Sequence, residues 1–336
     1  MTPIGWLEMC RGRSLVCFAL LGAQAPAPEA APQAPVVATA PGPIILQPGA
    51  LPADATPEAR AAWDALLTAM QPKPESAAVI TAFDLAIQTR VTTVGEGGGS
   101  QSNMVDLRYR YLHPGCISTT MADSKVERMR GPDGDWLWDP KKGDLVELAG
   151  KDFAQDRREL TQTLSIARNY LALAEPARLR IARLELLKSP PQGLPTFDAT
   201  IPPPKGSALA RAGELKWVSI TSPDFQLVEA VRSEAARLFT AQIGLDPTTH
   251  RPLLAMIHQD EGGTRVLETA VLVDLAADQF KEIDGRLVPT FFRVHDPLLP
   301  SSPFTFQSKA RVEVAIRPDS TLRAKWTVED FRPKRL

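Results

Sequence analysis

Apolar and polar residues alternate along much of this chain, and strict alternation is the pattern of a strand with one buried face. The stretch from Phe83 to Val91 shows it first, and the stretch from Val105 to Tyr111 repeats it. Alternating or short apolar runs continue over residues 179–187, 215–220, 238–245, 253–258, 266–273, 287–294, 304–316 and 322–328. Because turn residues separate most of these runs, we predict ten or more strands, joined by hairpins into one antiparallel sheet.

Two segments instead show the 3.6-residue period of amphipathic helices. The first begins at Thr56 and Pro57, a good helix start, and the second covers about 156–174 and ends at Pro176. A sheet of this length tends to curl, and the helices can then fill its concave side. We therefore expect an α+β fold, with a single large curved antiparallel sheet (an unclosed β-barrel) and helices packed on the concave face.

The turns are most explicit between Glu127 and Leu148, where Pro132-Asp133-Gly134 and Asp139-Pro140 bracket a short strand. Asp-Gly provides the positive φ angles of a tight hairpin, and proline fixes φ at a turn entry. Comparable turns occur at Gly244–Leu253 and Glu282–Thr290.

With these turns at this spacing, the chain from Trp63 to Asp296 resembles the bacterial LolA-like family of periplasmic lipoprotein carriers and outer-membrane lipoprotein-sorting proteins. Its members typically show an Asp-Gly hairpin with a following tryptophan and Asp-Pro, then a Leu-Asp-Pro turn, then a second Asp-Gly turn. The resemblance implies an unclosed barrel, a place in the bacterial envelope, and a non-enzymatic role in holding acyl chains.

Candidate ligand-binding residues come from an aromatic stripe on the predicted strands. Trp136 and Trp138 are two residues apart, so both project from one sheet face, and Leu107, Tyr109 and Tyr111 share a face in the same way. We predict that these five side chains line an apolar cavity; the alternative is an ordinary core beneath the helices. The covering helix would add two residues to the lining, Trp63 and Leu67.

Arg108 and Arg110 point to the side opposite the two tyrosines on their strand. They fit the rim of a groove, where they would contact a headgroup or a partner. The other interpretation, a solvated outer face of the sheet, is the more common arrangement.

Charge and motifs exclude several functions. The chain has 38 Lys plus Arg against 39 Asp plus Glu, so it has no basic excess with which to bind nucleic acid. It contains no P-loop, no G-x-S-x-G and no H-E-x-x-H motif, and its four histidines show no metal-ligand spacing. We expect no catalytic residues, no metal and no cofactor.

The N-terminus predicts export. Arg11 and Arg13 precede a short apolar run, and small residues follow, which makes residues 1–25 a candidate signal peptide. Residues 26–55 are rich in proline and alanine and predict a disordered linker. The LolA-like half-barrel domain would then cover 56–336, with a Pro-rich loop inserted at 189–206.

The leading hypothesis is therefore an exported carrier, periplasmic or secreted, that binds a lipid or an acylated protein in its concave face. An alternative is an envelope sensor or scaffold on the same fold, with a self-filled cavity and a protein partner. A third and weaker idea is a hydrolase assembled around Asp135 and His258. We expect a monomer, and the sequence does not identify the ligand.

Overall fold

The computed structural model describes residues 46–76, 78–94, 100–194, 206–227, 238–261, 264–295 and 311–333. The candidate signal peptide and residues 26–45 of the predicted linker lie outside this part, as do residues 195–205 of the Pro-rich loop. None of the helices in the described ranges combines the length and apolarity needed to cross a membrane.

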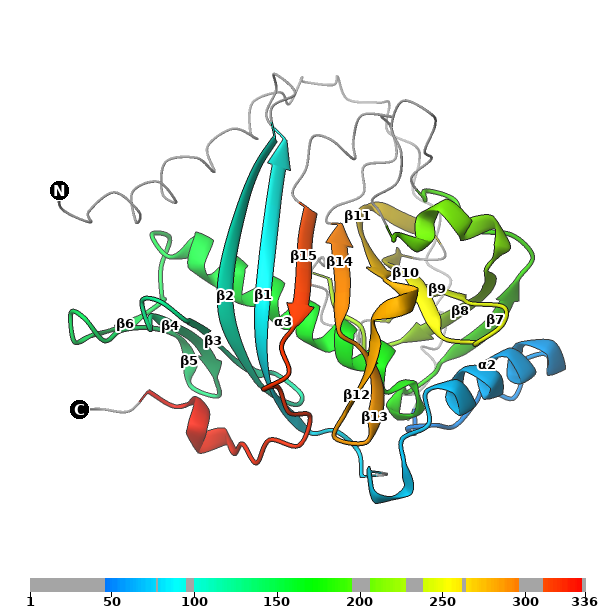
Figure 1. The fold of residues 1–336 in the computed structure, drawn as a ribbon, viewed down its shortest axis with the longest axis horizontal. Helices are drawn as coiled ribbons and strands as arrows, with labels where there is room; N and C mark the ends of the chain where they lie inside the picture. The colour runs from blue at the N-terminus through cyan, green and yellow to red at the C-terminus, as the bar shows by residue number, and fades with distance from the viewer. Residues whose placement is uncertain are drawn as a thin grey trace, which may run out of the picture. The chain divides into compact units, whose positions relative to one another are not determined.

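Thirteen strands form one antiparallel sheet whose two ends do not pair, so the barrel is unclosed, as predicted (Figure 1). The strand order is β6-β5-β4-β3-β2-β1-β15-β14-β11-β10-β9-β8-β7, and β12 and β13 form a separate hairpin. The first six strands are β1 (Ala82–Val94), β2 (Ser100–Leu112), β3 (Cys116–Met121), β4 (Glu127–Gly131), β5 (Gly134–Asp139) and β6 (Asp144–Glu147). The next five are β7 (Arg183–Leu187), β8 (Lys216–Ser222), β9 (Phe239–Leu245), β10 (Pro252–Glu261) and β11 (Thr264–Leu275). The last four are β12 (Phe280–Ile283), β13 (Arg286–Pro289), β14 (Phe291–His295) and β15 (Arg311–Ile316).

Two α-helices in the described part begin close to where the sequence places them. Helix α2 covers Pro57–Ala69, and the Thr56 hydroxyl caps it by accepting a hydrogen bond from the Ala59 N–H at 3.2 Å. Helix α3 covers Ala154–Ala174 and is followed by a 3₁₀ turn, η2, at Pro176–Arg178. The other short 3₁₀ turns are η1 (Pro74–Ser76), η3 (Ala208–Glu214), η4 (Ala277–Gln279) and η5 (Val328–Phe331).

Both helices cover the same face of the sheet, and the main hydrophobic core lies beneath them (Figure 1). Residues paired across antiparallel strands share a face, so the partners Phe83 and Tyr111 both point toward α3. Helix α2 packs on β7 and β8, at the other end of the strand order. We call this side the helix face and the opposite side the outer face.

The chain covers the outer face in two places. Over β8–β11, η3 packs against a second hydrophobic cluster that contains Trp217 and Met256. Over β1–β4, residues 317–333 cross the strands and end in η5. The approach is close at Gly131, where an added Cβ would lie 1.9 Å from the Phe331 carbonyl oxygen, so a residue without a side chain is required there.

The strand predicted at 322–328 is wrong. Within the described residues this segment contributes only a single bridge, between Thr321 and Asp84, before it turns into η5. Strand β1 pairs with β2 along its whole length but with β15 only from Ile87 onward, so near Asp84 one edge of β1 is open and forms this single bridge. The alternation has another cause: Leu322 is buried in the main core and Trp326 is half-buried, while Arg323 and Lys325 between them face solvent.

Candidate functional site

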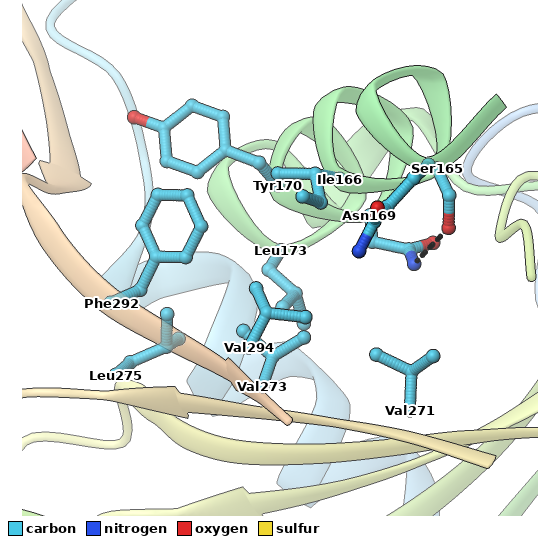
Figure 2. Close-up of a pocket in the computed structure, with 11 residues that line it drawn as sticks. Ser165, Ile166, Asn169, Tyr170, Leu173, Val271, Val273, Leu275, Phe292 and Val294 are labelled. Atoms are coloured by element: carbon cyan, nitrogen blue, oxygen red, sulfur yellow. Dashed lines mark hydrogen bonds between the residues drawn. The ribbon is translucent and has the colours of Figure 1, made fainter. Parts of the chain in front are cut away.

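A small cavity lies between α3 and the helix face (Figure 2). Its volume is about 10 Å³, close to the least that holds one water molecule. Apolar side chains from α3, β11 and β14 form most of its wall: Ile166, Tyr170, Leu173, Val271, Val273, Leu275, Phe292 and Val294.

One side of the cavity is polar and belongs to α3. Ser165 and Asn169 lie one helical turn apart there, and both bind Gln226, which follows β8. The Asn169 side-chain amide forms the same two hydrogen bonds with Gln226 that a neighbouring strand would form. Nδ2 donates to the Gln226 carbonyl at 2.8 Å, and Oδ1 accepts from the Gln226 backbone N–H at 2.9 Å. The Ser165 hydroxyl donates to the same carbonyl at 2.7 Å. These bonds fasten Pro223–Leu227, which we call the inner segment, to α3.

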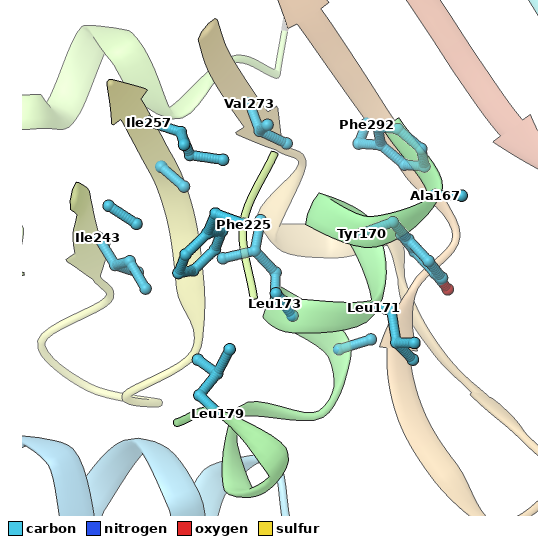
Figure 3. Close-up of a cluster of buried hydrophobic side chains, with 14 of the residues drawn as sticks. Ala167, Tyr170, Leu171, Leu173, Leu179, Phe225, Ile243, Ile257, Val273 and Phe292 are labelled. Atoms are coloured by element: carbon cyan, nitrogen blue, oxygen red, sulfur yellow. The ribbon is translucent and has the colours of Figure 1, made fainter. Parts of the chain in front are cut away.

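The inner segment places Phe225 in the core, with no exposed surface (Figure 3). In the figure its ring lies between Leu173 of α3 and the side chains of Ile243 and Ile257 on the sheet. A phenylalanine buries about 150–250 Å². The chain therefore fills the interior under α3 with its own aromatic ring.

Two arginines hold the start of the inner segment. Arg180 binds the Asp224 carboxylate through its backbone N–H at 2.7 Å and through Nη2 at 2.6 Å. Arg168 donates to the Pro223 carbonyl at 3.3 Å and to Oε1 of Gln226 at 3.1 Å. Burial alone would raise the pKa of Asp224, but the hydrogen bonds and charge of Arg180 outweigh it, so this pKa lies below its usual range.

His113 and Tyr111 border these arginines. The Tyr111 hydroxyl lies 3.2 Å from Nδ1 of His113. Burial, followed by the charges of Arg178 and Arg168, lowers the pKa of His113 to about 4, so the ring is neutral at pH 7. Burial raises the pKa of Tyr111 to about 12, and this hydroxyl stays protonated.

The three predicted site residues of β2 lie on the helix face. Tyr111 stacks on Phe83 with ring centroids 4.9 Å apart, and Tyr109 is buried. Leu107 is half-buried and packs against the main core. All three side chains contribute to the filled core under α3.

Trp136 and Trp138 lie on the outer face, opposite the tyrosines, so the expectation of one shared lining was wrong. The register shows it: Ser118 pairs with Met129, and Met129 pairs with Trp136. Ser118 also pairs with Arg110, which points away from α3. The number of residues in each turn decides which side chains of a strand point to which face. A one-residue difference moves all of them to the opposite face.

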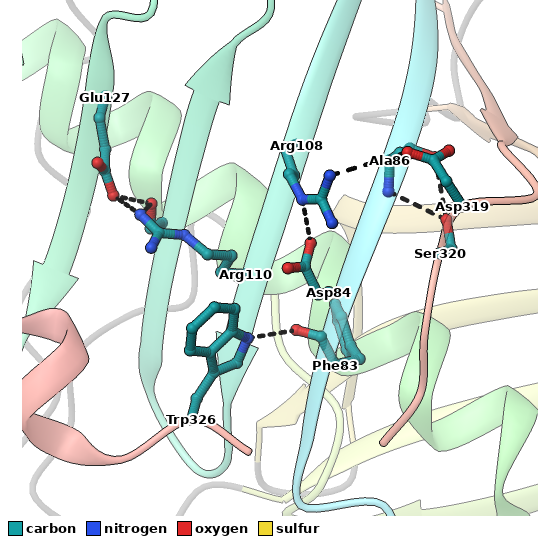
Figure 4. Close-up of polar contacts among 10 residues, drawn as sticks. Phe83, Asp84, Ala86, Arg108, Arg110, Glu127, Asp319, Ser320 and Trp326 are labelled. Carbon is teal, nitrogen blue, oxygen red and sulfur yellow. Dashed lines mark hydrogen bonds and ion pairs between the residues drawn. The ribbon is translucent and has the colours of Figure 1, made fainter. Parts of the chain in front are cut away.

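Arg108 and Arg110 are ion-paired on the outer face and do not form a rim of the cavity (Figure 4). Arg108 lies 2.6 Å from Asp84. Arg110 binds Glu127, and its guanidinium carbon lies 5.4 Å from the centre of the Trp326 ring. Arg108 is exposed on this face, whereas Arg110 is half-buried beside Trp326.

Trp63 and Leu67 lie on α2, against β7 and β8, and not over β2. Trp63 is fully buried, and Leu67 packs at the margin of the main core. The structure thus separates the predicted residues into three groups: under α3, under α2, and on the outer face.

The sequence interpretation missed Phe225 of the inner segment and the residues of α3 that hold this segment: Ser165, Arg168 and Asn169. Phe225 stands in a stretch without periodicity between two strands, which gave no signal. Ser165 and Asn169 did give one. Two polar residues four apart on a buried helix face need hydrogen-bond partners, and that requirement predicts a chain segment beside them.

Comparisons with known proteins give structural neighbours. No protein-family model matches the sequence, and no curated protein matches it. A LolA-superfamily protein from Nitrosomonas europaea is 11% identical, with 82% of this chain and 97% of that chain covered and a TM-score of 0.39. A domain described as an outer membrane lipoprotein-sorting protein, from Vibrio parahaemolyticus, is 11% identical over 81% and 95% of the two chains, with a TM-score of 0.38. A DUF1329 family protein from Desulfovibrio piger is 11% identical over 82% and 98%, also with a TM-score of 0.38. The first two neighbours carry the names of the family that the hairpins resemble.

Proposed function

We propose that the protein is an exported, non-enzymatic carrier that binds a lipid or an acylated protein between α3 and the sheet. The observation that supports this is the inner segment. It holds Phe225 in the apolar interior by hydrogen bonds to α3, and such bonds can exchange for bonds to water when the segment moves out. The residues that would contact an acyl chain are those of the cavity wall, Leu173, Val273 and Phe292 among them.

The structure is a closed form in this proposal. Sites for small molecules usually measure about 300–1,000 Å³, far more than the cavity observed. Binding therefore requires the inner segment, or α3, to move aside. Each methylene buried contributes about 0.8 kcal/mol, so ten of them give roughly 8 kcal/mol toward displacing Phe225 and the segment that carries it. Burial is non-directional, which permits a broad range of chains.

Native mass spectrometry with lipid extraction tests this on the full chain exported to a bacterial periplasm. The expected result is a stoichiometric phospholipid or acylated cargo on the wild type. The Trp138→Asp variant, which changes the outer face, should carry the same load. A clean unliganded mass, with no uptake of added fatty acid or lipopeptide, would contradict the carrier.

The filled interior favours a second candidate, the envelope sensor or scaffold. In that case Phe225 never leaves, and the protein acts through a protein partner. Loss of a protein-binding activity in an outer-face variant, together with no lipid uptake by any variant, would support it over the carrier.

A further inference from the structure

Positive charge exceeds negative charge where the inner segment meets α3 and η2. Four guanidinium groups lie there, and the described residues supply two carboxylates to them, Glu175 and Asp224. Arg286 and Arg178 share Glu175, at 2.7 and 3.9 Å. Arg180 forms an ion pair with Asp224.

Arg168 is left without a carboxylate among the described residues. Its two terminal nitrogens donate to neutral oxygens, those of Pro223 and Gln226. Its Nε is buried and has no hydrogen-bond partner in the described part of the chain. Burial, together with the charges of Arg180 and Arg178, lowers the pKa of Arg168. A half-buried cation of this kind is stabilised by an anion that binds to it.

One edge of the site, at Arg180, faces solvent. The Arg180 side chain is 40% exposed, and Arg168 and His113 are half-buried. His113 senses the same charges, because Arg178, Arg168 and Arg180 all lower its pKa. A bound anion would offset these charges and raise that pKa again.

The inner segment has the layout of an anionic lipid. Asp224 presents a carboxylate to Arg180, and the next residue, Phe225, enters the apolar core. On either side of this pair, Arg168 of α3 binds the Pro223 carbonyl and Asn169 of α3 binds the Gln226 carbonyl. A negative head followed directly by an apolar body is the order of groups in a phospholipid.

We propose that the ligand is a lipid with a phosphate headgroup, whose phosphate binds Arg168 and Arg180 while its acyl chain takes the place of Phe225. This inference rests on the proposed function and names its substrate class. Asp224 and Phe225 act as an internal competitor for the site. Arginine suits this role, because its planar fork binds two phosphate oxygens at once.

The test measures binding to the full chain by calorimetry with three probes: phosphatidic acid with six-carbon chains, the diacylglycerol with the same chains, and inorganic phosphate. Phosphatidic acid should bind at least about tenfold more tightly than the diacylglycerol, the factor expected from charge-assisted hydrogen bonds. Arg168→Gln should abolish this preference. Asp224→Asn and Phe225→Ala should each tighten binding of phosphatidic acid, since they remove parts of the competitor.

Arg157→Gln is the matched control. Arg157 is on the same helix and also donates to carbonyl oxygens, those of Leu148 and Gly150, so its loss changes charge equally without touching the site. Its preference for phosphatidic acid should equal that of the wild type. Melting temperatures of both arginine variants show whether they remain folded. Proton NMR of the His113 ring gives an independent readout, in which its pKa should rise from about 4 when phosphatidic acid binds.

Each contrary result has a distinct meaning. Equal affinity for phosphatidic acid and diacylglycerol, unchanged by Arg168→Gln, overturns the phosphate site and leaves the carrier intact. If inorganic phosphate raises the His113 pKa and neither lipid binds, the site takes free phosphate. That result contradicts both the lipid ligand and the carrier. No binding of any probe overturns both proposals.

Discussion

Replacing Phe225 with alanine tests whether the inner segment stands in for a ligand. The ring is fully buried between α3 and the sheet, and truncation of such a phenylalanine costs about 3–5 kcal/mol, because transfer energy is lost and a cavity remains. Apolar cavities of roughly 150 Å³ stay dry and bind small apolar molecules. The variant should therefore be less stable than the wild type and should take up acyl chains more readily.

The assay is urea unfolding of wild type and variant, with and without a short-chain phosphatidic acid. Ligand at about 100 times its dissociation constant adds roughly 2.7 kcal/mol of stability, so the variant should recover a large share of its loss. The wild type should gain less at the same ligand concentration, because the ligand must first displace Phe225.

Phe331→Ala is the matched control for this experiment. Phe331 is 1% exposed and packs on the outer face beside Gly131. Its truncation therefore removes a similar apolar area on the face opposite the proposed ligand site. It should lose stability and recover no more than the wild type does. Equal recovery in both variants, or none in Phe225→Ala, would refute the reasoning. If Phe225→Ala does not fold, Phe225→Leu gives the same comparison with a smaller cavity.

Three further predictions concern other contacts. Asn169→Ala removes both bonds to Gln226 and should cost about 1–3 kcal/mol in urea unfolding; an unchanged midpoint would show that the inner segment is not held there. His113 has a folded pKa of about 4, below the ordinary 6.5, so the unfolded chain binds its proton first and stability falls as pH drops from 6.5 toward 4. His113→Gln should flatten that part of the stability profile, and an identical slope would contradict the assigned pKa. Gly131→Ala places a Cβ against the Phe331 carbonyl, so limited proteolysis should cleave residues 317–333 faster than in the wild type; equal rates would mean that the approach is looser than described.

Local patterns predicted the fold well. The alternation of apolar residues located β1, β2, β8 and β9, and the Thr56-Pro57 cap located the start of α2. These features depend on neighbours within a few residues, where the periods of strand and helix are decisive. The Asp-Gly turns are also local: Gly134 and Gly285 have φ angles of 137° and 75°.

Long-range geometry limited the prediction of the site. Trp136 and Tyr109 carry the same strand signal, and only the register across β3 and β4 puts them on opposite faces. The segment after Leu322 alternates like a strand, yet the one strand pairing of this part of the chain within the described residues is the bridge between Thr321 and Asp84. Phe225 belongs to no periodic element, so its place in the core follows from the whole fold and not from its neighbours.

The most direct test of the central claim is to locate a bound acyl chain. The full chain is incubated with a fatty acid that carries a photoreactive diazirine near its end, irradiated, and mapped by peptide mass spectrometry. The account predicts cross-links in α3 between Ile166 and Leu173, and in β11 between Val271 and Leu275, which face each other across the cavity. Cross-links confined to the outer face around Trp136 and Trp138, or none above those of a denatured control, would contradict it.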